Sequence, residues 1–289
     1  MNSLTGFIFE NHIAHGAFVE LSEGVDEMLG HRHYSPDVQT LIGEAIAAMP
    51  LLTTHMRFEG RINLQFQGEG QMKLLVAQIN HQLQVRGMAK APETLSGSFT
   101  ELLYGGVLSL MMEPDVDSPQ PASQALVLIQ GGSLAEALEG YFARSEQLPT
   151  LIRLASSGER RCGFMLQRLP LEHTQATDDD WEHLLTLAQT LTREELLHVD
   201  ARSLLRRLFS TEDLRLFEPR PVQVVCRCTR SSVGRMLQSL GRKEVDSIIE
   251  EQGRVAVTCE FCGREQIFTP MDIGTLFAKL VVPGSETRQ

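Results

Sequence analysis

The chain has 289 residues, more than one hydrophobic core usually organises, so we expect about two domains. With 42% hydrophobic and 22% charged residues it resembles an ordinary globular protein, and no apolar run approaches the roughly 20 residues of a membrane span. The net charge of -11 argues against nucleic acid as the main partner, because phosphate binding needs local positive charge. The N-terminus lacks a signal-peptide pattern, so we expect a cytoplasmic protein.

The first 171 residues alternate short segments rich in β-forming residues with turn signals. This pattern predicts strands at 7–9, 17–21, 61–66, 73–79, 83–86, 106–112 and 125–129. A Ser-Pro pair at 35–36 predicts a helix that runs to Ala48, and Ser133 with Glu136 forms a capping-box pattern before a helix that reaches Arg144. Hairpin-like strands with helices packed on them indicate an α+β core domain at 1–171.

Residues 172–218 have a different character, with short helical patterns and many charges. Thr177 caps a predicted helix whose first turn holds the aspartates at 178–180, and two further helices are predicted at 192–198 and 201–209. Each has a narrow apolar stripe and a dense charged face, so each must dock on another part of the protein to be stable. Because the apolar area is modest, we expect weak docking and a metastable helical linker.

The last segment, 219–289, begins at two prolines and is interpreted as a small separate domain. A strand at 222–225 leads into a first pair of cysteines. The remaining predicted elements are a helix at 243–251 that ends at Gly253, a hairpin of strands at 254–258 and 265–268 around a second pair of cysteines, and a terminal helix that begins at Thr269.

Four of the five cysteines follow the pattern C-x-C-x30-C-x2-C: Cys226, Cys228, Cys259 and Cys262. A C-x2-C knuckle on a hairpin directs two sulfur atoms to one point, and a second close pair completes the thiolate tetrahedron of structural zinc sites. A segment of about seventy residues buries too little apolar surface to fold firmly without such a staple. The spacing therefore predicts Zn²⁺ as the cofactor of the reduced protein.

The spacing leaves two interpretations of this site open. In one, the metal is only a structural staple. In the other, oxidation converts the four thiolates into two disulfides and releases the ion, and a strained disulfide across one residue is easily reduced again. Loss of the metal would then remove the platform on which the linker helices pack. Cys162 stands apart in an apolar strand, and we expect it to be a buried, unreactive side chain.

Several motifs, in the same order along essentially the whole chain, resemble the 33 kDa chaperonin family of redox-regulated heat-shock holdases. They are GEGQMKLLVAQIN at 68–80, YGGVLSLMM at 104–112, YFARSEQLPT at 141–150, CGFMLQRLP at 162–170, CRC at 226–228 and CEFC at 259–262. The sequence departs from the usual family pattern at Gln71, Cys162, 229–232 and Gln266, and none of these departures removes a cysteine of the proposed zinc site.

The resemblance implies an ATP-independent chaperone rather than an enzyme, inactive while its four cysteines bind zinc. Oxidants such as hypochlorous acid, or peroxide with heat, would join Cys226 to Cys228 and Cys259 to Cys262 and expel the ion. The linker would then lose order and bind unfolding client proteins, and the active protein would be a homodimer without nucleic-acid or membrane partners. Nine linker residues would form the client-binding surface: Trp181, Leu184, Leu185, Leu196, Leu197, Leu204, Leu205, Leu208 and Phe209.

Two other functions have weaker support. A zinc-containing nucleic-acid or translation-associated binding protein would use arginines of the last segment as phosphate contacts, but the acidic chain and the lack of interleaved aromatic residues weigh against it. Those arginines are Arg220, Arg227, Arg230, Arg235 and Arg242. A thiol–disulfide oxidoreductase using Cys259 and Cys262 would lack the βαβ setting of a catalytic C-x-x-C.

Overall fold

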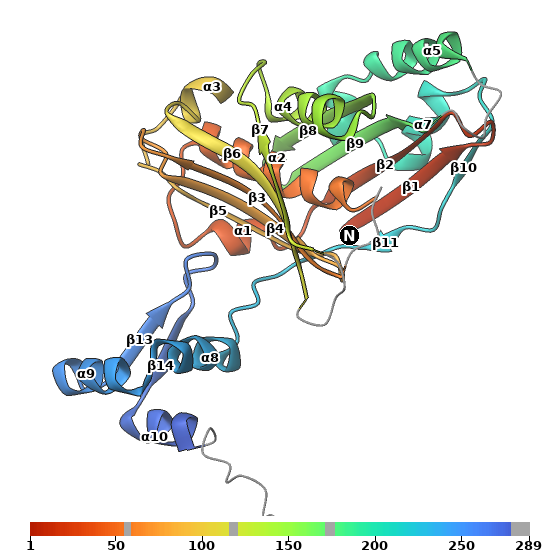
Figure 1. The fold of residues 1–289 in the computed structure, drawn as a ribbon. Coiled ribbons are helices and arrows are strands. Elements are labelled where there is room, and N and C mark those ends of the chain that lie inside the picture. Colours follow the sequence, from red (N-terminus) through yellow and green to blue (C-terminus); the bar gives the residue numbers. More distant parts are fainter. Residues whose placement is uncertain (55–58, 116–120, 171–176, 279–289) are drawn as a thin grey trace, which may run out of the picture. The chain divides into compact units, whose positions relative to one another are not determined.

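The computed structural model describes residues 1–54, 59–115, 121–170 and 177–278 (Figure 1). Its backbone forms two compact units, Met1–Val225 and Cys226–Gln289. Mixed strands and helices confirm the α+β class. None of the helices in these ranges is long and apolar enough to cross a membrane.

The first unit contains two sheets of six strands each. The first sheet has the order β10-β1-β2-β9-β8, with β11 also paired to β1. Its strands are β1 (Ser3–Phe9), β2 (Ala14–Leu21), β8 (Thr150–Ser157), β9 (Arg160–Arg168), β10 (Leu214–Leu216) and β11 (Arg220–Pro221). The second sheet has the order β12-β5-β4-β3-β6-β7. Its strands are β3 (Gly60–Gly68), β4 (Leu74–Asn80), β5 (Gln84–Lys90), β6 (Gly106–Pro114), β7 (Ser123–Val127) and β12 (Gln223–Val224).

Helix α2 (Pro36–Leu52) packs against both sheets of this unit. Its start is as predicted, because the Ser35 side chain accepts a hydrogen bond from the Val38 N–H, but it extends one turn beyond Ala48. One glycine in each sheet allows that sheet to approach α2 closely. A Cβ on Gly163 would lie 2.9 Å from the Leu51 side chain, and one on Gly87 would lie 2.7 Å from the Ile46 side chain. The helix therefore forms a shared core between the two sheets.

Three further helices lie in the first unit outside the linker: α1 (Val25–Leu29), α3 (Phe99–Leu102) and α4 (Leu134–Tyr141). Ser133 caps α4 as predicted, by accepting a hydrogen bond from Glu136 N–H, but the Glu136 carboxylate accepts from Gly132 rather than from Ser133. The prediction of an α-helix as far as Arg144 is wrong at its end. The α-helix stops at Tyr141, and the chain continues as a π-helical turn at Phe142–Glu146.

The linker forms the three predicted helices, α5 (Asp178–Gln189), α6 (Arg193–His198) and α7 (Ala201–Leu208). Thr177 and Thr192 cap α5 and α6 in reciprocal capping boxes with Asp180 and Glu195. The helices cover the face of the first sheet that carries Phe164, whereas the neighbouring Gly163 faces α2. Both faces of this sheet are therefore covered.

Two expectations for the linker need correction. The apolar side chains of α5, α6 and α7 pack on the first sheet, so the zinc module is not the platform for these faces. The expected modest docking area is also wrong, because the apolar faces join a large cluster that contains Phe7, Phe9, Phe18 and Phe164. By its contacts, the described part of the linker belongs to the first unit. Residues 172–176 and 279–289 lie outside the described residues.

The described part of the second unit, up to residue 278, is a short hairpin with three helices: α8 (Arg230–Leu240), α9 (Arg242–Gln252), β13 (Val255–Thr258), β14 (Glu265–Phe268) and α10 (Pro270–Ala278). The hairpin, α9 and α10 match the predictions, while α8 was not expected. The buried core of the described part is small and consists of Val233, Leu237, Val245, Val255, Phe268 and Ile273. A core of this size provides little stability by itself.

Candidate metal centre and linker surface

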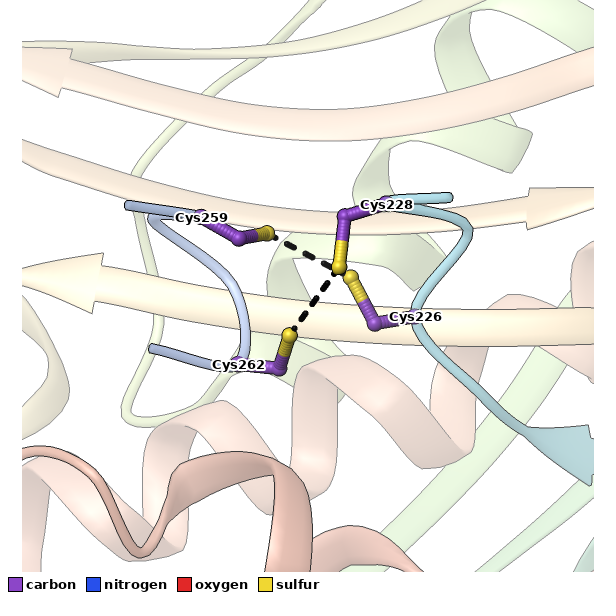
Figure 2. A group of neighbouring side chains, drawn as sticks. All are labelled: Cys226, Cys228, Cys259 and Cys262. Atoms are coloured by element: carbon purple, nitrogen blue, oxygen red, sulfur yellow. Dashed lines mark hydrogen bonds between the residues drawn. The ribbon is translucent and has the colours of Figure 1, made fainter. Parts of the chain in front are cut away.

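Cys259 and Cys262 lie on the tight turn between β13 and β14. The Cys259 N–H donates to the Arg264 carbonyl at 3.0 Å, and the Gly263 N–H donates to the Cys259 carbonyl at 2.8 Å. Gly263 has a φ of 67°, a conformation that costs glycine little and other residues more. These bonds hold the knuckle that the C-x2-C spacing predicts, with both sulfur atoms on one side of the turn (Figure 2).

Cys226 and Cys228 lie in the segment that precedes α8. The Thr229 side chain caps this helix by accepting from Ser232 N–H, and the Ser232 hydroxyl donates to the Arg227 carbonyl at 3.1 Å. The Thr229 N–H also donates to the Arg227 carbonyl, at 2.9 Å. The helix start therefore fixes the backbone between the two cysteines.

The four sulfur atoms converge within 4.8 Å of one another (Figure 2). The Cys226 and Cys259 sulfurs are 3.5 Å apart, and the Cys228 and Cys262 sulfurs are 3.3 Å apart. Tetrahedral zinc with Zn–S bonds of about 2.3 Å requires sulfur separations of about 3.8 Å. The four thiols therefore fit a tetrahedral metal site, and an all-thiolate set is the ligand chemistry of structural zinc.

Burial and crowding make the Cys228 thiol costly to ionise without a cation. The pKa of the Cys228 thiol is raised, first by burial and then by hydrogen bonds with the neighbouring cysteines. Metal ligands must be thiolates, so a divalent cation would compensate the charge that these sulfurs bring together. The geometry and the electrostatics thus favour metal binding.

Cys162 lies on β9, far along the chain from this cluster, and is 0% exposed. Burial raises its pKa to about 11, although Arg160 opposes the shift. The prediction of a buried side chain is confirmed. Its thiol is protonated at neutral pH and covered by the cluster that includes the linker helices.

The nine predicted client-binding residues all belong to one apolar cluster. Eight of them are 0% to 4% exposed, and Leu185 is partly buried at its margin. They contact the aromatic face of the first sheet, where Phe7 and Phe164 stack with ring centres 5.9 Å apart and Phe9 meets Phe209 edge-on at 5.0 Å. Neither side of this contact is available to a client while the linker is docked.

Polar contacts that the sequence did not reveal also hold the linker. Arg193 on α6 donates to the Ser156 carbonyl and lies 3.5 Å from the Glu44 carboxylate of α2. Burial raises the pKa of Glu44 to about 7, while the Arg193 charge opposes this shift. The ion pair joins residues 149 positions apart, so no local sequence pattern could indicate it.

A second feature, which the sequence predicted only in part, is the extended segment 213–225, which we call the strap. It contains β10, β11 and β12 and connects α7 to the first cysteine pair. The predicted strand at 222–225 is shorter than expected, because only Gln223–Val224 pairs, in parallel with β5. The alternation of Leu214 with Leu216 and of Val222 with Val224 is the available sequence signal, but it is too short to be decisive.

The chain is similar to known proteins along almost its whole length. The family model described as "Hsp33 protein" matches residues 2–269. The 33 kDa chaperonin of Methylobacillus flagellatus is 38% identical over 98% of this chain and 97% of its own length, and that of Pseudomonas aeruginosa is 38% identical over 98% and 97%. The crystal structure of the 33 kDa chaperonin of Thermotoga maritima matches with a TM-score of 0.80 and 22% identity, over 97% of this chain and 99% of that chain.

The sequence and the fold are thus similar to those of these relatives over almost the whole length. The predicted resemblance is confirmed, and so is the expectation of a chaperone rather than an enzyme, because the relatives are named chaperonins. The chain belongs to the Hsp33 family of molecular chaperones.

Proposed function

We propose that the chain is a redox-regulated, ATP-independent holdase that prevents aggregation of unfolding proteins in the cytoplasm during oxidative and heat stress. The observation that carries this proposal is the convergence of four thiols, from two cysteine pairs, within 4.8 Å. These thiols are the ligands that would bind Zn²⁺ in the reduced, inactive form. Bound zinc would supply the stability that the small core of the second unit lacks.

Oxidation removes the four thiolate ligands by forming two disulfides, and each disulfide consumes one molecule of oxidant. Each disulfide forms from two thiolates, which lose two electrons to one hypochlorous acid molecule, and with one proton taken up from water the oxidant becomes chloride and water. We propose the pairs Cys226–Cys228 and Cys259–Cys262, since one residue separates the cysteines of the first pair and two residues separate those of the second. Four sulfurs in two disulfides no longer carry the charge that retains a divalent cation.

Loss of the metal weakens the second unit and, through the strap, the docking of the linker. The linker helices and the sheet beneath them together hold the apolar surface that a client would contact. Release of the linker therefore exposes both sides of this contact at once. We propose that the exposed surface binds clients and supports homodimer formation.

Two of the arginines named for a nucleic-acid function have structural partners within the second unit. Arg230 lies over the Phe268 ring at 4.3 Å and pairs with Asp272 at 2.9 Å, and Arg242 pairs with Asp246 at 2.8 Å. These contacts account for two of the five side chains without a phosphate ligand. No observation favours that alternative over the holdase.

The proposal is tested by light scattering from a heat-unfolding model substrate. We expect the reduced, zinc-loaded protein to leave aggregation unchanged and the oxidised, zinc-free protein to suppress it, with release of one zinc ion per chain. The matched control is Cys162→Ala, which keeps all four ligands and must switch like the wild type. Equal protection by both forms would refute redox control, and no protection by either would refute the holdase function.

A further inference from the structure

The strap covers the outer edge of both sheets in the first unit. β10 pairs with β1 in the register Phe7↔Leu216, β11 pairs with the start of β1, and β12 pairs with β5. Further bonds continue the ladder: the Phe217 N–H donates to the Gly6 carbonyl at 2.9 Å, and the Val222 N–H donates to the Asn2 carbonyl at 3.1 Å. An extended segment of the chain thus occupies positions that any other extended polypeptide could fill.

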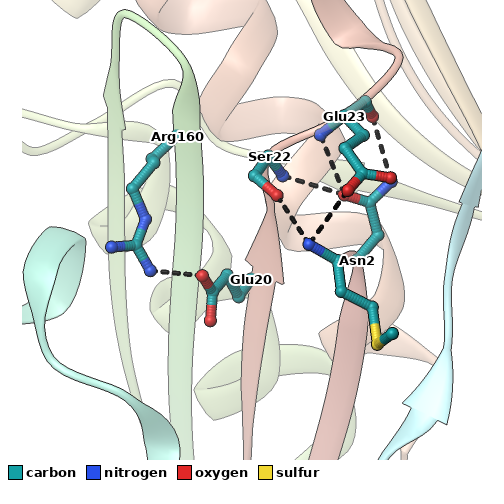
Figure 3. A network of polar contacts seen from close by, with 6 residues as sticks. Asn2, Glu20, Ser22, Glu23 and Arg160 are labelled. Atoms are coloured by element: carbon teal, nitrogen blue, oxygen red, sulfur yellow. Dashed lines mark hydrogen bonds and ion pairs between the residues drawn. The ribbon is translucent and has the colours of Figure 1, made fainter.

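The acceptor for Val222 is held firmly in place. The Asn2 side chain accepts hydrogen bonds from the Ser22 and Glu23 N–H groups at 2.8 and 3.0 Å, and the Met1 ammonium group donates to Ser22 at 3.0 Å (Figure 3). This network ties the beginning of β1 to the end of β2. The edge of β1 therefore does not depend on the strap for its shape.

The strap itself is weakly held compared with the linker helices. Its strands have three, two and two residues, and Phe217 and Val225 are 48% and 38% exposed. Val222, at 4%, is the buried anchor. Exposed ladder bonds contribute modestly and open before buried cores do. The segment is thus the first part of the linker region expected to detach.

The strap also adjoins the metal centre in sequence. The Val225 N–H donates to the Val85 carbonyl at 3.1 Å, and the next residue is the ligand Cys226. A change in the backbone at Cys226 therefore acts directly on the last bond of the strap. The linker helices have no such direct connection.

A groove of about 600 Å³ begins at this edge of β1 and extends across the neighbouring strands β2 and β9. Gly6, Ile8 and Leu169 line it together with Phe217 and Arg220 of the strap. The Phe217 ring packs 3.2 Å from the position of a Cβ on Gly6. When the strap leaves, the groove and the backbone edge become one continuous site for an apolar, extended segment.

We propose that the β1 edge and this groove, vacated by the strap, bind an extended segment of an unfolding client in the strap's place. The inference rests on the proposed holdase function. Backbone ladder bonds are independent of client sequence, and the groove accepts apolar side chains without demanding one shape. This combination suits a chaperone whose clients share only exposed, extended, apolar chain.

The test uses a synthetic peptide of residues 213–223, which contains no cysteine, as a competitor for client binding by the full-length oxidised protein. N-methylation of Phe217 in the peptide removes its donor to Gly6. N-methylation of Leu216 is the matched control, because hydrogen-bonded and non-bonded pairs alternate in an antiparallel ladder and the Leu216 N–H points away from β1.

We expect the unmodified and Leu216-methylated peptides to reduce protection of the substrate, and the Phe217-methylated peptide to compete about two- to tenfold less well, the effect of one ladder bond. Protection that none of the peptides affects, or that both methylated peptides affect equally, would overturn the edge site and leave the holdase function standing. Absence of protection by the oxidised protein without peptide would instead refute the holdase function and the edge site with it.

Discussion

At the scale of single residues, the cysteine cluster poses a question that its spacing alone does not answer. Sulfur atoms of the two pairs lie close together, at 3.5 Å for Cys226 with Cys259 and 3.3 Å for Cys228 with Cys262. Convergence on one metal explains these separations, because tetrahedral ligands are all mutual neighbours. Once the sulfurs separate, the shortest chain connections favour bonds within each pair.

Arg227 allows the pairing to be read directly, because trypsin cleaves between Cys226 and Cys228. If the proposed pairs form, digestion of oxidised protein yields peptide 216–227 linked to 228–230, and peptide 255–264 with an internal disulfide. Mass spectrometry without reduction distinguishes this result from cross-pairing. Linkage of peptide 255–264 to either cysteine of the first pair would show that the proposed pairing is wrong.

Glu44 gives the docked linker a pH dependence. Its pKa is raised from 4.5 to about 7, mainly by burial, so the folded protein favours the protonated carboxyl. This contribution to stability is complete below pH 4.5 and is lost as the pH rises through 7. Glu44→Gln keeps an oxygen that can accept from Arg193 and removes the titration.

We therefore expect the stability of the wild type, relative to Glu44→Gln, to fall between pH 5 and pH 7 by at most about 1.4 kcal/mol per pH unit. Urea unfolding followed by the fluorescence of Trp181 measures the difference. Trp181 is the only tryptophan and lies 4% exposed in the linker cluster. Parallel pH profiles for the two proteins would contradict this role of Glu44.

At the scale of elements, the linker helices are well determined locally but are held by tertiary packing. Each begins at a strong cap, and α7 ends with its buried leucines on one face. The apolar side chains of these helices pack on the sheet, but helices this short do not stay folded alone in water. These elements can therefore be folded or released as a group.

The linker should respond to loss of a single buried side chain. Leu205 on α7 is 0% exposed, and its replacement by Ala removes about 2–5 kcal/mol of packing. We expect Leu205→Ala to protect a heat-unfolding substrate while still reduced and zinc-bound. Arg206→Ala, on the exposed face of the same helix, is the matched control and should stay inactive. If neither reduced variant protects the substrate, linker docking does not restrain the chaperone activity.

The sequence predicted elements whose signals are local and missed those defined by distant partners. The cap at Thr177 and the cysteine hairpin were both predicted from local patterns. Helix α8 was missed because Gly234 weakens its pattern, and only the fold shows that a Cβ there would lie 2.9 Å from Leu276 of α10. Only the 222–225 part of the strap was predicted, because strands of two or three residues have no periodicity. The linker's platform was misassigned because docking partners are not encoded locally.

At the scale of the whole molecule, the proposed switch links events in separate parts of one chain. Thiol oxidation acts on the second unit, the strap connects this unit to the sheet edges, and the linker helices cover the apolar face of the first sheet. The central claim is that oxidation at the cysteine cluster uncovers that face. Cys162 lies beneath the linker in the apolar cluster and is not one of the four converging cysteines. Its thiol can therefore report whether the linker covers the sheet.

With four cysteines in disulfides, Cys162 is the one thiol left in the oxidised protein. Its reaction with a thiol-specific reagent under native conditions tests the central claim most directly. We predict that it is unreactive in the reduced, zinc-bound form, as its burial and its pKa of about 11 require, and that one thiol per chain reacts after oxidation. A Cys162 thiol that stays protected in oxidised protein that holds its substrate would contradict the account.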